Sequence, residues 1–160
     1  MTQVTILMGS ASDKPIAQKA EKILERMNIT FETYVASAHR TPARVVEVIE
    51  NSSADVFIAL AGLSAALPGV VAAHTLKPVI GVPCASSSSP ANLDSLLSVV
   101  QMPPGVPVAT VAVGKSGAKN SAILAVQILA TSDDDLARKL KEYKENMRAE
   151  VLEKDKQLNS

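Results

Sequence analysis

The string from Ser37 to Pro42, Ser-Ala-His-Arg-Thr-Pro, contains the residues best suited to acid–base chemistry. It lies between a strand-like run and a helix-like run. A helix N-terminus and a neighbouring guanidinium both disfavour an imidazolium, so we expect a neutral His39 that can accept a proton. Arg40 has the planar donor fork that binds a phosphate bidentately. The alternative interpretation is a His and an Arg exposed in an ordinary loop.

A second polar string, Gly9 to Asp13, reads Gly-Ser-Ala-Ser-Asp and also follows an apolar run. The helix start after it offers free N–H groups to an anion, and Ser10 and Ser12 add hydroxyl donors. Asp13 would repel a phosphate, so it suits the hydroxyls of a ribose. The alternative is an ordinary turn in which Asp13 caps the helix. Neither G-x-G-x-x-G nor a Walker loop is present here, which disfavours a dinucleotide or nucleoside triphosphate site.

Other residues carry weaker signals. The string from Ala61 to Gly69 is rich in small residues, and by itself it is best explained by close packing of a helix on a sheet. His74 falls inside a predicted helix and is assigned to packing or to the surface. Cys84, predicted in a loop with no second thiol and no obvious base, is assigned a structural role. No set of Asp, Glu or His residues has the spacing of metal ligands, so no metal site is predicted.

Short apolar runs alternate with helical patterns along the whole chain, which predicts a parallel sheet covered on both faces. The predicted strands are residues 4–8, 30–36, 56–61, 78–83 and 106–113. The first predicted helix follows Asp13 and has its last apolar position at Met27. The other predicted helices span residues 41–51, 67–75, 92–100, 116–130 and about 133–156. Thr41 is a candidate N-cap, with Pro42 as the first helical residue. In such a sheet ligands bind beyond the carboxyl ends of the strands, where both polar strings lie.

We expect one domain spanning residues 1–160. Its last helix, from Asp133 to about Lys156, begins with acidic residues that suit the helix dipole and continues with many Lys and Glu residues. Its apolar positions fit two interpretations: a solvated helix with one stripe on its own core, or a helix that reaches a neighbouring subunit. We favour the second.

Composition excludes several classes of protein. The chain of 160 residues has 16 basic and 16 acidic residues, and this balance argues against a nucleic-acid-binding protein. No apolar run is long enough to span a membrane, and Met1 to Ser10 does not resemble a signal peptide. A single cysteine excludes intramolecular disulfides and sites built from several cysteines. We therefore expect a cytoplasmic protein whose near-zero net charge does little to oppose self-association.

Several strings, taken in order, resemble the PurE family of purine biosynthesis, the N5-carboxyaminoimidazole ribonucleotide mutases. The resemblance covers nearly the whole chain, and its combination of motifs is highly specific. It is carried by the strings at residues 8–13, 37–42, 67–69, 78–83, 94–96 and 101–103 and by Pro107-Val108. It implies a flavodoxin-like α/β/α sandwich with a five-stranded parallel sheet, assembled as a homo-octamer with sites at subunit interfaces. It implies no metal, ATP, biotin or flavin.

The resemblance also implies the reaction. CO2 leaves the exocyclic nitrogen of the carbamate and is recaptured at ring carbon C4 to give the 4-carboxy product. His39 matches the catalytic His of the family, which moves the proton between carboxylate and ring carbon. Ser10 and Arg40 match contacts to the phosphate and substrate, with Ser37 beside them, and Asp13 matches the ribose contact.

One motif leaves the source of CO2 open. Bacterial mutases usually have Gly-Gly-Ala-Ala-His-Leu-Pro-Gly, whereas this chain has Ala66 at the position of the His. Ser64, Ala66 and Leu67 look more like the sister class, which carboxylates aminoimidazole ribonucleotide directly with CO2. The mutase class is matched by Arg40, Pro42, Pro68 and the string at residues 101–103. A third hypothesis is a non-enzymatic flavodoxin-like module, although no aromatic residue lies in the polar strings to stack on a flavin. The Ser-rich loop from Ser86 to Pro90 is a candidate lid.

Overall fold

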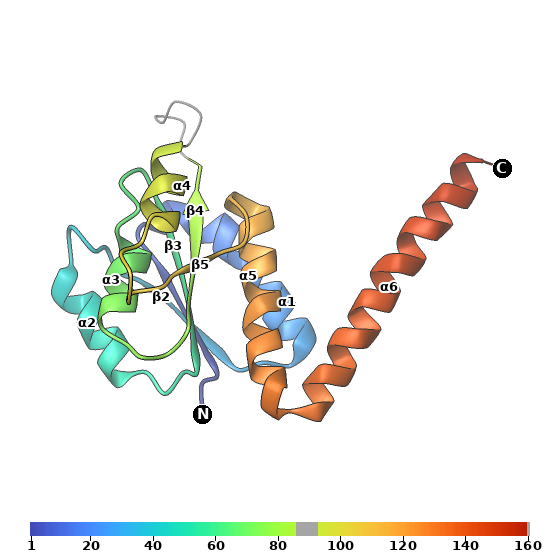
Figure 1. The fold of residues 1–160 in the computed structure, drawn as a ribbon, viewed down its shortest axis with the longest axis horizontal. Helices are drawn as coiled ribbons and strands as arrows, with labels where there is room; N and C mark the ends of the chain where they lie inside the picture. The colour runs from blue at the N-terminus through green and yellow to red at the C-terminus, as the bar shows by residue number, and fades with distance from the viewer. Residues whose placement is uncertain (86–92, 160) are drawn as a thin grey trace.

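The computed structural model describes residues 1–85 and 93–159, built around a five-stranded parallel sheet (Figure 1). The strands are β1 (Val4–Met8), β2 (Phe31–Val35), β3 (Val56–Gly62), β4 (Val79–Cys84) and β5 (Ala109–Thr110). Their order across the sheet is β2-β1-β3-β4-β5, and each neighbouring pair is parallel. The order reverses between β1 and β3, which is the doubly wound arrangement of flavodoxin-like folds. The predicted fold class is confirmed.

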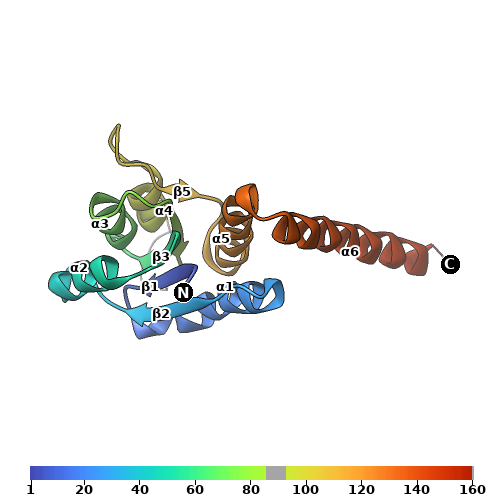
Figure 2. The same cartoon turned by 90° about the horizontal axis from the view of Figure 1, so that it is seen from below.

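Helices cover both faces of the sheet. They are α1 (Lys14–Met27), α2 (Pro42–Asn51), α3 (Leu67–Ala73), α4 (Leu93–Val100), α5 (Gly114–Leu129) and α6 (Asp134–Leu158), with short 3-10 helices η1 (Ala11–Asp13) and η3 (Ala130–Ser132). Figure 2 shows α1 and α5 against one face and α2, α3 and α4 against the other. This arrangement gives each polar string a strand end before it and a helix start after it.

The apolar continuity of the strands follows from burial on both faces. In β1, Ile6 and Met8 belong to the core beneath α1 and α5, whereas Leu7 belongs to the core beneath α2 and α3. All five residues of β1 are buried. Because successive side chains alternate between faces, a strand inside a three-layer sandwich is apolar at nearly every position, and the one polar residue of β1, Thr5, shares a hydrogen bond with Ser52 at 2.7 Å. The central strands therefore form a rigid base for the loops at their carboxyl ends.

The fifth strand, β5, is present as predicted, but it is much shorter than residues 106–113, so the predicted bounds are wrong. Only Ala109 and Thr110 pair with β4. Proline lacks the N–H group that a sheet ladder needs, so Pro107 cannot donate to it, and two further prolines precede it at residues 103 and 104. After Thr110 the chain turns into α5, which begins at Gly114.

Two residues lie at their predicted N-cap positions, but neither side chain makes the expected capping hydrogen bond. Asp13 is at the N-cap of α1, but its side chain makes no capping hydrogen bond. Thr41 is at the N-cap of α2, but its hydroxyl oxygen accepts a hydrogen bond from the Ser37 N–H at 2.9 Å instead. Pro42 does begin α2, as predicted. Both side chains therefore serve the loops at the strand ends rather than the helices.

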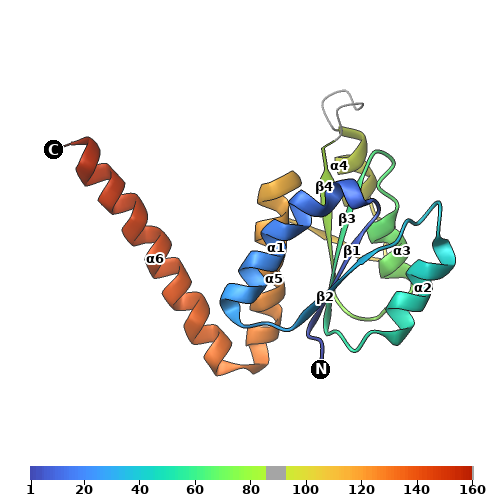
Figure 3. The same cartoon turned by 180° about the vertical axis from the view of Figure 1, so that it is seen from behind.

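The last helix, α6, packs on the body only through its first turns. Leu136 is buried, and Tyr143 packs against the core with its ring 5.0 Å from the Arg26 guanidinium carbon. Lys139 Nζ donates to the Met27 carbonyl at 3.2 Å. Beyond Tyr143 the helix leaves the body, as Figures 1 and 3 show from opposite sides. Among the described helices, α6 included, none combines the length and apolar character that a membrane crossing requires.

Candidate active site

A cavity of about 680 Å³ opens beyond the carboxyl ends of β1, β2 and β3. Its lining comes from the segments that follow these strands, with Ala85 after β4. The switch point between β1 and β3 lies at its floor, where flavodoxin-like folds bind ligands. All five residues that the sequence predicts for the site line this one cavity: Ser10, Asp13, Ser37, His39 and Arg40. Its size is in the range of small-molecule sites.

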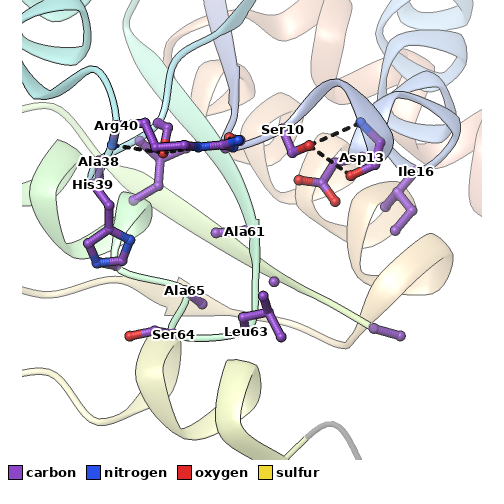
Figure 4. Close-up of a pocket in the computed structure, with 17 residues that line it drawn as sticks. Ser10, Asp13, Ile16, Ala38, His39, Arg40, Ala61, Leu63, Ser64 and Ala65 are labelled. Carbon is purple, nitrogen blue, oxygen red and sulfur yellow. Dashed lines mark hydrogen bonds between the residues drawn. The ribbon is translucent and has the colours of Figure 1, made fainter. Parts of the chain in front are cut away.

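The loop after β1 presents hydroxyl groups to the cavity. Ser10 caps η1, and its Oγ accepts hydrogen bonds from the Ser12 N–H at 3.3 Å and the Ser12 hydroxyl at 2.9 Å (Figure 4). Since Ser10 Oγ already accepts, its own hydrogen remains to be donated to an anionic ligand. The first turn of α1 adds little, because the Lys14 N–H donates to the Ala11 carbonyl oxygen and Pro15 has no N–H, so the Ser10 hydroxyl is the donor here. This corner of the cavity is therefore suited to a phosphate.

The Asp13 carboxylate points into the same cavity (Figure 4). It is half-buried, and desolvation by burial raises its pKa, although hydrogen bonds from the Ser10 backbone and the Cys84 thiol lower the pKa in part. Because the carboxylate does not cap α1, its oxygens remain able to accept hydrogen bonds from a ligand. A carboxylate beside a phosphate corner is suited to sugar hydroxyls.

The loop after β2 holds Arg40 in a defined position. Its Nη2 donates to the Gly9 carbonyl at 2.9 Å, and its Nε donates to Ser37 Oγ at 3.3 Å. The Arg40 backbone N–H also donates to Ser37 Oγ at 3.3 Å. The guanidinium thus spans from the end of β2 to the end of β1, with its remaining N–H donors available to an anion. Ser37 acts as the support that keeps Arg40 there.

The His39 ring lies on the opposite side of the cavity from Ser10 and Asp13, near Ser64 and Ala65 (Figure 4). The residue is exposed, so its ring nitrogens can be reached by a ligand in the cavity. A ligand whose phosphate binds near Ser10 therefore extends toward an imidazole at its other end. Its role in proton transfer stays a prediction.

The segment after β3 contributes more to the cavity than predicted. Residues 61–67 line it, so close packing alone does not explain that string. Packing still contributes: a Cβ added at Gly62 would lie 3.2 Å from the Cys84 carbonyl oxygen. Leu63 has φ 53°, a left-handed conformation that favours glycine, and the usual mutase motif has glycine at this position. Ala66, at the position of the missing His, also lines the cavity.

The structure also gives the positions of the other residues for which the sequence analysis made an assignment. Cys84 is the last residue of β4 and is 1% exposed, so the loop prediction is wrong. His74 is exposed at the far end of α3, with Nδ1 2.8 Å from the Val70 carbonyl. Ser12, which the sequence analysis names as a second hydroxyl donor beside Ser10, also lines the cavity. The candidate lid, Ser86 to Pro90, lies outside the described residues. Within residues 1–85 and 93–159, no three His, Cys, Asp or Glu residues are grouped to hold a metal ion.

Comparisons with known proteins agree with this geometry. The family model described as AIR carboxylase matches residues 3–150. A relative from Methanocaldococcus jannaschii, named N5-carboxyaminoimidazole ribonucleotide mutase, is 54% identical over 97% of this chain and 96% of its own length. A Bacillus subtilis relative of the same name is 51% identical over 97% of both chains. The crystal structure of Treponema denticola PurE superposes with a TM-score of 0.86 at 31% identity, covering 100% of both chains.

The fold and the cavity define a doubly wound α/β domain with a nucleotide-sized site at its switch point. The chain belongs to the AIR carboxylase family, also called PurE.

Proposed function

We propose that this chain is an N5-carboxyaminoimidazole ribonucleotide mutase of purine biosynthesis, an isomerase that moves CO2 from the exocyclic nitrogen to ring carbon C4. The single observation that carries this proposal is the gathering of Ser10, Asp13, Arg40 and His39 around one cavity. Hydroxyl and guanidinium donors, a carboxylate and an imidazole around one cavity suit the phosphate, the ribose and the ring of a ribonucleotide. The mutase name of relatives about half identical over nearly the whole chain supports the same assignment.

The substrate is bound from its phosphate end. Ser10 and Arg40 hold the phosphate by charge-assisted hydrogen bonds, and Ser37 keeps the guanidinium in place. Asp13 accepts hydrogen bonds from the ribose hydroxyls. The aminoimidazole ring then lies between the small residues after β3 and the His39 imidazole. Binding energy from the phosphate and ribose thereby fixes the ring for reaction.

The chemistry needs one proton carrier. When the N–C bond of the carbamate breaks, CO2 is released and the exocyclic nitrogen gains a proton. Ring carbon C4 then forms a C–C bond to CO2 and loses its own proton, so no net proton is consumed. His39 carries the proton at C4. The cavity keeps the released CO2 against the ring, which is catalysis by proximity. This chemistry uses no metal or organic cofactor.

A paired assay tests the mutase against the direct carboxylase, which Ala66 brought into question. One arm supplies the N5-carbamate in buffer depleted of bicarbonate; the other supplies aminoimidazole ribonucleotide, bicarbonate and carbonic anhydrase. We expect fast formation of the 4-carboxy product in the first arm only, at modest bicarbonate. Fast product mainly in the second arm would identify a carboxylase. If the folded protein forms no product in either arm, a non-enzymatic binding module would be favoured.

We further propose that the protein is a cytoplasmic homo-octamer of single-domain chains, with α6 reaching a neighbouring copy. The support is that α6 extends away from its own body, as Figures 1 and 3 show, and that its apolar residues beyond Tyr143 are exposed. The exposed residues are Met147, Val151, Leu152 and Leu158. A helix that continues an apolar stripe past its own core has surface to bury against another chain. A single buried cysteine suits a reducing compartment.

The replacement Val151→Glu tests this role of α6. Val151 is 67% exposed, so a glutamate is harmless in the monomer but places a charge in the proposed interface. We expect light scattering to give an assembly larger than a dimer for the unchanged protein and smaller species for the variant. Ala149→Glu is the matched control, since it adds the same side chain on the opposite face of the same turns. The proposal would be contradicted if the protein without substitutions were a monomer, or if both variants dissociated the assembly equally.

A further inference from the structure

The turn that carries His39 and Arg40 is closed by a residue that the proposed mechanism does not use, Thr41. The Thr41 backbone N–H donates to the Ser37 carbonyl oxygen at 2.9 Å, which closes the turn from Ser37 to Thr41. The Thr41 hydroxyl oxygen accepts a hydrogen bond from the Ser37 N–H at 2.9 Å, and the hydroxyl lies 3.3 Å from the Ser37 carbonyl oxygen, to which it donates. One side chain thus contacts both backbone polar groups of Ser37.

Both ends of this turn are attached to regular secondary structure. Before it, the Ala36 N–H donates to the Met8 carbonyl oxygen at 2.9 Å, which ties the chain to the end of β1. After it, the Thr41 carbonyl oxygen accepts from the Val45 N–H at 3.3 Å, in the first turn of α2. The Thr41 hydroxyl therefore joins the sheet end to the helix start across the base of the turn. Side chains that project from the turn depend on this join for their direction.

Arg40 and His39 depend on the turn to different degrees. The Arg40 guanidinium has anchors of its own, the Gly9 carbonyl oxygen at 2.9 Å and Ser37 Oγ at 3.3 Å. The His39 ring has none, since no group within residues 1–85 and 93–159 makes a hydrogen bond to it. The direction of the imidazole in the cavity is therefore set by the backbone of the turn, and the Thr41 hydroxyl helps to fix that backbone.

We propose that Thr41 is a positioning residue, whose hydroxyl fixes the turn from Ser37 to Thr41 so that the His39 imidazole is held at the reacting ring carbon. This inference rests on the proposed function for the identity of the substrate and the role of His39. Thr41 is not among the described residues that line the cavity, so it acts only through the turn. A small displacement of a reacting group is costly in rate. Loss of the hydroxyl therefore lowers kcat, whereas the anchored Arg40 preserves binding.

The variants Thr41→Val and Thr41→Ser separate the hydroxyl from the rest of the side chain. Valine keeps the branched shape of threonine without the hydroxyl, and serine keeps the hydroxyl without the methyl group. We expect Thr41→Val to lower kcat roughly tenfold with KM within about twofold, because the loss of two hydrogen bonds loosens the turn. We expect Thr41→Ser to keep kcat within about twofold of the unchanged protein. Normal kcat in Thr41→Val, or an equal fall in both variants, would overturn the proposal.

Thr75→Val is the matched control. The Thr75 hydroxyl oxygen accepts from the Lys77 N–H at 3.1 Å, so valine removes the same kind of contact there. Thr75 lies between α3 and β4, at the amino end of the sheet and away from the cavity. We expect normal kcat in this variant, with a melting temperature close to that of Thr41→Val. A fall in kcat equal to that of Thr41→Val would show that a general loss of stability lowers turnover, and would contradict positioning.

Hydrogen exchange followed by mass spectrometry tests the turn without any activity. The backbone N–H groups of Ser37, Arg40 and Thr41 all donate within the turn. We expect the peptide covering residues 36–42 to take up deuterium roughly fivefold faster in Thr41→Val, and Thr41→Ser to exchange like the unchanged protein. Equal exchange in Thr41→Val and the unchanged protein would refute the role of the hydroxyl.

The two kinds of measurement keep this inference distinct from the proposed function. If the unchanged protein forms no product in the paired assay, the proposed function fails. The exchange comparison still decides whether the Thr41 hydroxyl fixes the turn that carries His39.

Discussion

Replacing His39 with asparagine is expected to abolish turnover while still allowing the nucleotide to bind. Positioned proton transfer contributes up to about 10⁴-fold in rate, and no other imidazole is among the described residues that line the cavity. The asparagine side chain keeps hydrogen-bonding groups of similar reach but cannot carry a proton. Ser10 and Asp13 lie on the other side of the cavity, and the Arg40 guanidinium is held independently by the Gly9 carbonyl, so binding should survive. We expect a fall in kcat of about 10³-fold or more, measured in single turnovers.

The matched control is His74→Asn, which changes the other histidine of the chain. His74 is exposed at the end of α3 that points away from the cavity, and asparagine is well tolerated at helix ends. Its turnover should equal that of the unchanged protein. Calorimetric titration with the 4-carboxy product would show that His39→Asn still binds. Turnover near normal in His39→Asn would remove the proton-carrier assignment.

The largest effect on stability is expected for Gly117→Ala. Gly117 is in α5, which packs across the sheet beside α1. An added Cβ would clash with the Ala112 carbonyl oxygen, which is backbone and cannot rotate away. Alanine gains about 1 kcal/mol of helix propensity, but forcing the backbone apart costs more. We expect a net loss of about 2–3 kcal/mol in the free energy of unfolding, measured by denaturant titration.

Gly69→Ala, in α3, is the matched helical control. Its added Cβ would meet only the flexible end of Met102, at 3.4 Å. Met102 can move aside, so helix propensity should make this change neutral or slightly stabilising. If both variants lost stability equally, close approach at Gly117 would not be the cause.

The sequence predicts the fold and the location of the site because both depend on short-range patterns. Runs such as Val4–Met8 are apolar at nearly every position only when both faces of a strand are covered. Polar strings directly after such runs must lie at one edge of a parallel sheet. The gathering of Ser10, Asp13, Ser37, His39 and Arg40 was therefore predictable without coordinates.

Features that depend on three-dimensional detail were not predictable. A side chain at an N-cap position is expected to cap, and only the 3-10 turn before α1 shows that Ser10 caps while Asp13 faces the cavity. The effect of the Cys84 thiol on the pKa of Asp13 joins residues far apart in sequence, so no local pattern indicates it. The contribution of the segment after β3 could not be predicted, because only the structure shows that this segment lines the cavity as well as packing.

The prolines that shorten β5 have a consequence for how copies of this chain can associate. A long, regular edge strand is a template on which another sheet adds strands and aggregates. Here one edge pairs through only two residues, with Pro107 just before them, and the other edge strand, β2, carries the exposed Glu32. Neither edge offers an uninterrupted apolar ladder. Sheet extension between copies is thus disfavoured. An ordered assembly would instead form through helical surfaces, each of which binds a defined number of partners.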